Sequence, residues 1–333
     1  MKNFLKILIE PRLPGILIPF FLSIILWVIP LFFAESSALW VKQNTAFSTA
    51  LSNYAAFSPL WAKFIAFLFS IFIGFVLLQL NNRFSFIRMR NSLLFFFYII
   101  LIGTNIQLHH FDFSQLSVLF LLLIVWQLFA SYDTKQPVFN AFNIGLFVAL
   151  GSFFSVELLL FWPVLLFGIQ RLKGLTTRTF LANTLGLLTP FLFFIGLAFI
   201  LDGDVISYFY LFIKQFEVIV YWQFTMATVI YLVVLSAFAI IAIHTIIKDP
   251  FSDKIKVSRM LSFIAVAFVF FVVLFFLKSN NLPIIFILAT VFSSMLYAHF
   301  FSLKNSLITR ILFFTLLFFC LLNYLFTLFS ITL

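Results

Sequence analysis

Four side chains in this sequence combine a reactive type with a position that would suit chemistry: Glu35, His110, Asp112 and Glu157. Each of them ends or interrupts a long apolar run. A carboxylate in such a position can act as a general base, hold a divalent cation, or bind a phosphate-linked substrate through that cation. Glu35 and Glu157 are the stronger candidates, because apolar sequence adjoins both and an unpaired charge there is costly.

Metal and cofactor chemistry receives little further support from the sequence. His109 and His110 are adjacent, so their rings point apart and lack the i, i+4 spacing of a shared ligand set. The one cysteine, Cys320, cannot form a disulfide or a cysteine-based zinc site within the chain. We therefore predict no specific cofactor and no protein metal site, and a divalent cation beside the carboxylates stays an open alternative.

The composition defines the environment in which these residues must be placed. Hydrophobic residues make up 64% of the chain and charged residues 9%, with a mean hydropathy of +1.21. These values exclude a soluble domain with a polar shell. Apolar runs reach the length of a membrane span and strand alternation is absent, which predicts helices and not a barrel. The fold class is therefore all-α, a polytopic transmembrane helix bundle in which residues 1–333 form a single integral membrane domain.

The apolar runs predict about 11 spans. They cover roughly 13–33, 60–80, 93–106, 116–130, 139–154, 158–169, 181–200 and 225–247, then two spans flanking Lys278, and 311–331. The halves of 139–169 are each short of the roughly 20 residues of a perpendicular span. Two thin spans and a re-entrant hairpin both fit this stretch.

The basic residues predict which side each loop occupies. In this arrangement 16 of the 20 Lys and Arg residues fall on one side, which the positive-inside rule identifies as cytoplasmic. The other four, Lys42, Lys63, Lys214 and Lys278, fall on the outer side. The N-terminus is then cytoplasmic, the C-terminus is outer, and the four candidate residues all lie at the outer face. Two outer segments are expected at the membrane surface: the loop 34–59, with a candidate surface helix, and an interfacial amphipathic helix over 205–222.

The net charge of +10 is spread between apolar segments and not gathered in one domain. This pattern is typical of membrane topology and not of nucleic-acid binding. We therefore expect membrane lipids, and no nucleic acid, as partners. The predicted location is the bacterial inner membrane.

The order of elements from about residue 12 to 200 resembles polytopic glycosyltransferases of the GT-C superfamily. The likeness rests on Glu35 after the first span, on Asn82-Arg83-Phe84-Ser85-Phe86 before the third, and on the run from Phe142 to Arg171. The resemblance implies that an acid just after the first span, here Glu35, is the catalytic base and that the donor is a polyprenyl-phosphate sugar. His110 or Asp112 would assist the donor phosphate. Glu35 is followed by Ser36 and not by a second acid, which departs from the superfamily's pattern.

Along most of its length the chain is also similar to an uncharacterised family of polytopic integral membrane proteins of Bacteroidota-type bacteria, from which no activity can be transferred. Three functions therefore stay open. The first is a GT-C-like glycosyltransferase at the outer face. The second is a non-catalytic structural or assembly subunit with protein partners in an inner-membrane envelope complex. The third is a transporter or lipid flippase, with Glu157 as a candidate substrate-binding residue in the broken stretch.

Overall fold

The structure is a computed structural model. It describes residues 13–33, 58–87, 92–134, 136–172, 174–200, 226–248, 255–278, 281–303 and 306–332, and a few isolated positions between them. Glu35, most of the loop 34–59 and most of the segment 205–222 lie outside the described residues. The two predicted surface segments therefore stay predictions.

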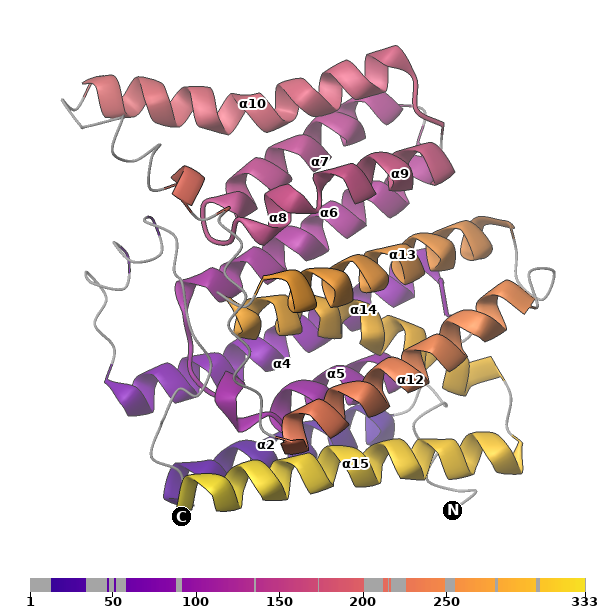
Figure 1. Ribbon diagram of the computed structural model, residues 1–333. Coiled ribbons are helices and arrows are strands. Elements are labelled where there is room, and N and C mark those ends of the chain that lie inside the picture. Colours follow the sequence, from indigo (N-terminus) through magenta and orange to yellow (C-terminus); the bar gives the residue numbers. More distant parts are fainter. Residues whose placement is uncertain are drawn as a thin grey trace.

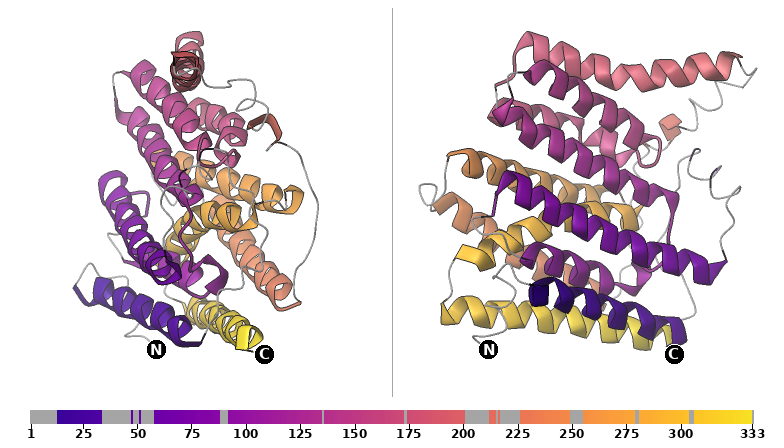
Figure 2. Two further views of the ribbon diagram at one scale, coloured as in Figure 1. Left: turned by 90° about the vertical axis from the view of Figure 1, so that its left-hand side faces the viewer. Right: turned by 180° about the vertical axis from the view of Figure 1, so that it is seen from behind.

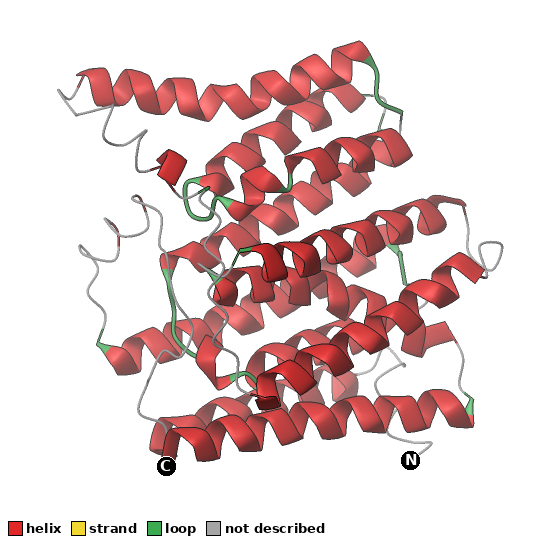
Figure 3. Ribbon diagram, viewed as in Figure 1, coloured by secondary structure: helices red, strands yellow, loops and turns green. Residues whose placement is uncertain are grey.

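The described residues fold into helices and contain no strand, which confirms the all-α prediction (Figure 3). The α-helices are α2 (Leu13–Phe33), α4 (Pro59–Phe84), α5 (Leu93–Gly103), α6 (Leu116–Asp133), α7 (Pro137–Ser152), α8 (Glu157–Leu160), α9 (Trp162–Leu172), α10 (Thr177–Ile200), α12 (Met226–Lys248), α13 (Ile255–Leu277), α14 (Leu282–Leu303) and α15 (Leu307–Thr332). Two short 3-10 helices, η1 (Ile106–Leu108) and η2 (Phe113–Gln115), join α5 to α6.

Within the described chain, 7 helical segments are long and apolar enough to cross a membrane, as a membrane protein requires. They are 59–84, 113–132, 177–197, 229–248, 255–277, 282–303 and 307–329. Shorter apolar helices cover 14–30, 93–103 and 137–152. The predicted count of eleven spans and the sidedness of the termini stay predictions.

The predicted span 93–106 is longer than the helix that forms there. Helix α5 has 11 residues and ends at Gly103, so it rises only about 16 Å, roughly half the thickness of a bilayer's hydrocarbon core. All 11 of its residues are buried. An apolar run therefore marks burial here, and the hydropathy of the sequence could not distinguish a buried half-length helix from a full span.

Successive long helices run back and forth across one bundle, with α14 inside it and α10 at one edge (Figures 1 and 2). At the opposite edge α2 and α15 lie side by side, and the Tyr324 hydroxyl donates to the Leu26 carbonyl at 3.1 Å. We call the end of the bundle at which α2 ends and α4 begins the predicted outer end, on the left in Figure 1. The other end is the predicted inner end.

The arginines of the described helices agree with this assignment of sides. They lie near helix termini at the predicted inner end, namely Arg83, Arg171, Arg178, Arg259 and Arg310. Arginine near the cytoplasmic ends of spans is the pattern that the positive-inside rule describes. The sidedness itself was predicted from these basic residues and stays a prediction.

Glycines allow α10 to dock closely on α7. A Cβ added at Gly145 would lie 2.0 Å from the Asn183 carbonyl oxygen, and one at Gly186 would lie 2.1 Å from that of Phe142. Small residues permit this kind of backbone approach between membrane helices. The buried Asn183 side chain adds hydrogen bonds to the Ala141 carbonyl at 2.8 Å and from the Trp162 indole at 2.6 Å. These contacts fix α10 on α7 and α9.

Candidate functional site

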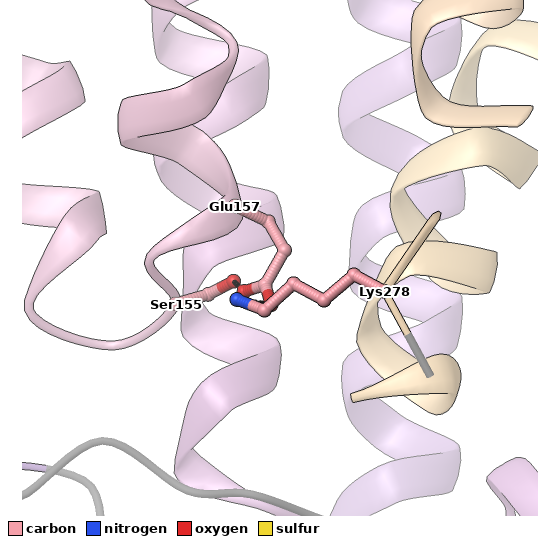
Figure 4. Close-up of polar contacts among 3 residues, drawn as sticks. All are labelled: Ser155, Glu157 and Lys278. Atoms are coloured by element: carbon pink, nitrogen blue, oxygen red, sulfur yellow. Dashed lines mark hydrogen bonds and ion pairs between the residues drawn. The ribbon is translucent and has the colours of Figure 1, made fainter. Parts of the chain in front are cut away.

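A buried ion pair joins two turns at the predicted outer end. Lys278 Nζ lies 2.9 Å from Glu157 Oε1, and the Ser155 hydroxyl donates to the other carboxylate oxygen, Oε2 (Figure 4). The side chains of Lys278 and Glu157 are only 5% and 2% exposed. Both oxygens of Glu157 therefore have a partner, and the pair links residues 121 positions apart.

The local sequence explains why the chain turns at this ion pair. Helix α7 ends at Ser152, and the Ser155 amide donates back to the Gly151 carbonyl at 3.0 Å. A Cβ at Gly151 would lie 2.4 Å from Leu158 Cδ1, so glycine lets the returning chain pack closely. Helices α7, α8 and α9 thus form a hairpin with Glu157 at its tip.

The depth of the pair follows from helix lengths. Lys278 directly follows α13, whose 23 residues rise about 34 Å, slightly more than a hydrocarbon core of about 30 Å. By helix length, the pair therefore lies toward the bilayer boundary on the predicted outer side and not at the midplane. The 16 residues of α7 rise about 24 Å, which fits a thin span and a re-entrant arm equally.

His110 and Asp112 lie in a second turn at the same end, between η1 and η2. Both are partly exposed. Asp112 caps η2, because its Oδ1 accepts from the Ser114 amide at 3.3 Å. The Gln115 side chain donates to the His110 carbonyl at 2.9 Å. The structure brings these two predicted residues into one turn, whereas Glu157 belongs to another.

His109 anchors that turn on α2. Its ring stacks on Trp27, with ring centroids 3.9 Å apart and planes 10° apart. Nε2 lies 3.0 Å from the Gly103 carbonyl, which can only accept, so Nε2 carries the proton. His109 belongs to the connection between α5 and α6, outside both helices, and burial lowers its pKa to about 3. The ring is therefore neutral at physiological pH and packs as an aromatic group.

The turn is also tied to α4. The Phe111 amide donates to the Ala62 carbonyl at 3.2 Å, which places the turn beside the first helical turns of α4. Lys63 follows Ala62, and its charge is close enough to lower the pKa of His109 further. A cation therefore lies at the predicted outer end, near the turn that carries His110 and Asp112.

Lys63 and Lys278 are the residues that sequence reasoning did not single out. Both were assigned to the outer side as charges for topology. Their signal was present in the sequence, since Lys63 interrupts an apolar helix and Lys278 closes one. Their neighbours, however, come from distant parts of the chain.

Metal ligation receives no support from the described part of the chain, where no group of three or more His, Cys, Asp or Glu side chains converges. The divalent cation considered from the sequence therefore stays a prediction. What the geometry offers is a partly exposed imidazole and carboxylate beside a lysine, and a separate buried ion pair. The first set could bind a phosphate, and the second holds two turns together.

No family model, curated protein or solved structure matches the chain.

Proposed function

We propose that this membrane protein is a GT-C-like glycosyltransferase that uses a polyprenyl-phosphate-linked sugar at the outer face of the bacterial inner membrane. One observation supports it most. The turn with His110 and Asp112 is anchored on α2 and α4, at the end of the bundle where Glu35 follows α2. His110 and Asp112 thus belong to a turn that packs on α2, the helix that Glu35 follows in the sequence.

Chain geometry limits how far Glu35 can be from this turn. From Trp27, which stacks on His109, α2 continues for six residues to Phe33 and rises about 9 Å. Two further residues span at most about 7.6 Å. The Cα of Glu35 is therefore within about 17 Å of that of Trp27, which is compatible with one site for a lipid-linked sugar.

The proposed roles follow from the charges. Glu35 accepts the proton of an acceptor hydroxyl while the acceptor oxygen bonds to the sugar's anomeric carbon. The bond from that carbon to the phosphate oxygen breaks, and polyprenyl phosphate leaves with the electron pair. In this proposal Lys63 opposes the phosphate charge and His110 hydrogen-bonds the phosphate, while Asp112 positions the turn through its cap of η2.

The test uses the purified protein in nanodiscs with defined polyprenyl-phosphate sugars, and mass spectrometry to follow donor consumption and product. Glu35→Gln should lower turnover by about 10²- to 10⁴-fold, the usual contribution of a general base. Asp112→Asn should lower it less, because the asparagine side chain can still accept the capping hydrogen bond from the Ser114 amide and the base is unchanged. Asp133→Asn is the matched control, since Asp133 ends α6 at the bundle end opposite Asp112, and it should keep full activity.

Two outcomes would contradict this proposal. Full activity in Glu35→Gln would remove the base assigned here. The second outcome is that the native protein leaves the donor intact and co-purifies with stoichiometric partners in mild detergent. This result would favour the assembly-subunit alternative.

The transporter alternative has less support from the structure. The Glu157–Lys278 pair lies at helix ends, whereas transport sites are usually near the midplane of the bilayer.

A further inference from the structure

Two adjoining cavities at the predicted inner end share one arginine. The first, of about 500 Å³, is lined by Phe167, Gln170, Arg171, Gly174 and Arg259. The second, of about 460 Å³, begins at Arg171 and continues between α12 and α13. A cationic pocket therefore opens into a groove between two membrane helices.

The two arginines are available to an anion. Arg171 and Arg259 are both exposed, and within the described chain no carboxylate pairs with either. Arg259 Nη1 donates to the Leu172 carbonyl at 3.4 Å, which holds its side chain across the gap between α13 and α9. A guanidinium has five N–H donors, so most of those of Arg259 and all of those of Arg171 can face a phosphate.

The groove has the chemistry of a lipid chain site. Isoleucines of α12 form one wall, Ile243, Ile246 and Ile247. The wall on α13 combines small side chains with valines, Ser258, Ser262, Ala265, Val266 and Val269. From Ser258 to Val269 the helix rises about 17 Å. One leaflet of hydrocarbon is about 15 Å deep, so the groove matches the depth of one acyl chain that starts at the headgroup level.

We propose that this site binds an anionic phospholipid of the inner leaflet, with its phosphate on Arg171 and Arg259 and an acyl chain between α12 and α13. Basic pockets between helices on the cytoplasmic side of a membrane recognise anionic headgroups in this way. The occupant is a lipid and not a free anion, because the arginine pocket and the apolar groove form one continuous surface. The site is at the opposite end of the bundle from the turn with His110 and Asp112, so it does not depend on the proposed enzyme activity.

Native mass spectrometry of the full chain in detergent tests the site, with phosphatidylglycerol, phosphatidylcholine and inorganic phosphate as separate probes. Phosphatidylglycerol should bind more tightly than phosphatidylcholine. Arg171→Gln and Arg259→Gln should each weaken the binding of phosphatidylglycerol about fivefold, and the double variant should weaken it about thirtyfold. These factors are those expected from the loss of one near-surface cation in each substitution. Arg178→Gln is the matched control, because Arg178 is exposed at the same end but lines neither cavity. It should bind like the native chain.

Comparison of dioleoyl with dihexanoyl phosphatidylglycerol tests the groove without any mutation. The long-chain lipid should bind more tightly, since only its chain fills the groove between α12 and α13. Equal binding of the two anionic lipids, or competition by inorganic phosphate at equal concentration, would overturn the lipid assignment in favour of a simple anion site. Equal binding of phosphatidylglycerol and phosphatidylcholine, or no loss in the double variant, would overturn the arginine assignment. All variants are compared at matched monodispersity.

Discussion

The Glu157–Lys278 pair supports a quantitative prediction about stability. Lys278→Met removes the cation and leaves a carboxylate that is only 2% exposed beside Ser155. Glu157→Gln removes the anion and leaves a lysine that is 5% exposed. Both single variants should be markedly less stable than the native chain, because each leaves one buried charge without its counter-charge.

The magnitude follows from burial and contact. Removal of one partner of a buried ion pair costs about 3–5 kcal/mol, whereas replacement of both partners by neutral side chains of similar size is often close to neutral. The separation of 2.9 Å and the hydrogen bond from Ser155 place this pair in that class. We therefore expect each single variant to lose about 3 kcal/mol or more, and the double variant Glu157→Gln with Lys278→Met to regain most of that loss.

The assay is a double-mutant cycle on the thermal stability of the purified protein in one detergent. Unfolding of membrane proteins is often irreversible, so the four proteins are compared at one heating rate. The coupling energy isolates the pairwise contribution from the change in packing. A second cycle with Ser155→Ala shows whether its hydroxyl stabilises the carboxylate independently of Lys278.

Single variants whose stability is within about 0.5 kcal/mol of that of the native chain would refute this reasoning, because changes of that size are typical of surface substitutions. A double variant no more stable than either single variant would show that the two charges do not stabilise each other. In that case the burial of both side chains would need another cause.

Two further predictions concern packing and pH. Gly145→Ala places a Cβ 2.0 Å from the Asn183 carbonyl oxygen and should destabilise the α7–α10 contact by about 1–3 kcal/mol. Gly196→Ala meets no atom within 4 Å and should stabilise its helix by about 0.5–1 kcal/mol. The thermal midpoints of the two variants and the native chain test this difference. Burial lowers the pKa of His109 from 6.5 to about 3, so the unfolded chain binds the proton first and stability falls as pH decreases from about 6.5 toward 3. Between pH 7 and 5 the free energy of unfolding should fall by about 2 kcal/mol. This loss should be absent in His109→Phe, which keeps a ring beside Trp27. The same pH dependence in both proteins would exclude His109 as its source.

Several elements could be predicted from the sequence alone. The first predicted span, 13–33, coincides with α2, and the second, 60–80, lies within α4. The break at Ser155-Val156-Glu157 was also visible, because polar residues interrupt an apolar run there. These features depend on short stretches of chain, which sequence patterns report directly.

The sequence did not predict the extent of α5 or the neighbours of the candidate residues. Helix α5 is surrounded by protein on all sides, and its apolar run looks the same as that of a helix that crosses a bilayer. Lys278 was assigned to an outer loop, and only the approach of the α13 end to the α7–α8 turn makes it the partner of Glu157.

By itself the sequence determined that this is a helical membrane protein, because a chain with 64% hydrophobic residues in lipid must satisfy its backbone hydrogen bonds within helices. It also determined which residues end the apolar runs and could carry chemistry. Only the tertiary structure decided that Glu157 meets Lys278, that His109 stacks on Trp27, and that Arg171 and Arg259 share one pocket. The physical reason is that hydropathy is a property of each segment and its solvent, whereas an ion pair, a ring stack or a binding pocket depends on how distant helices pack.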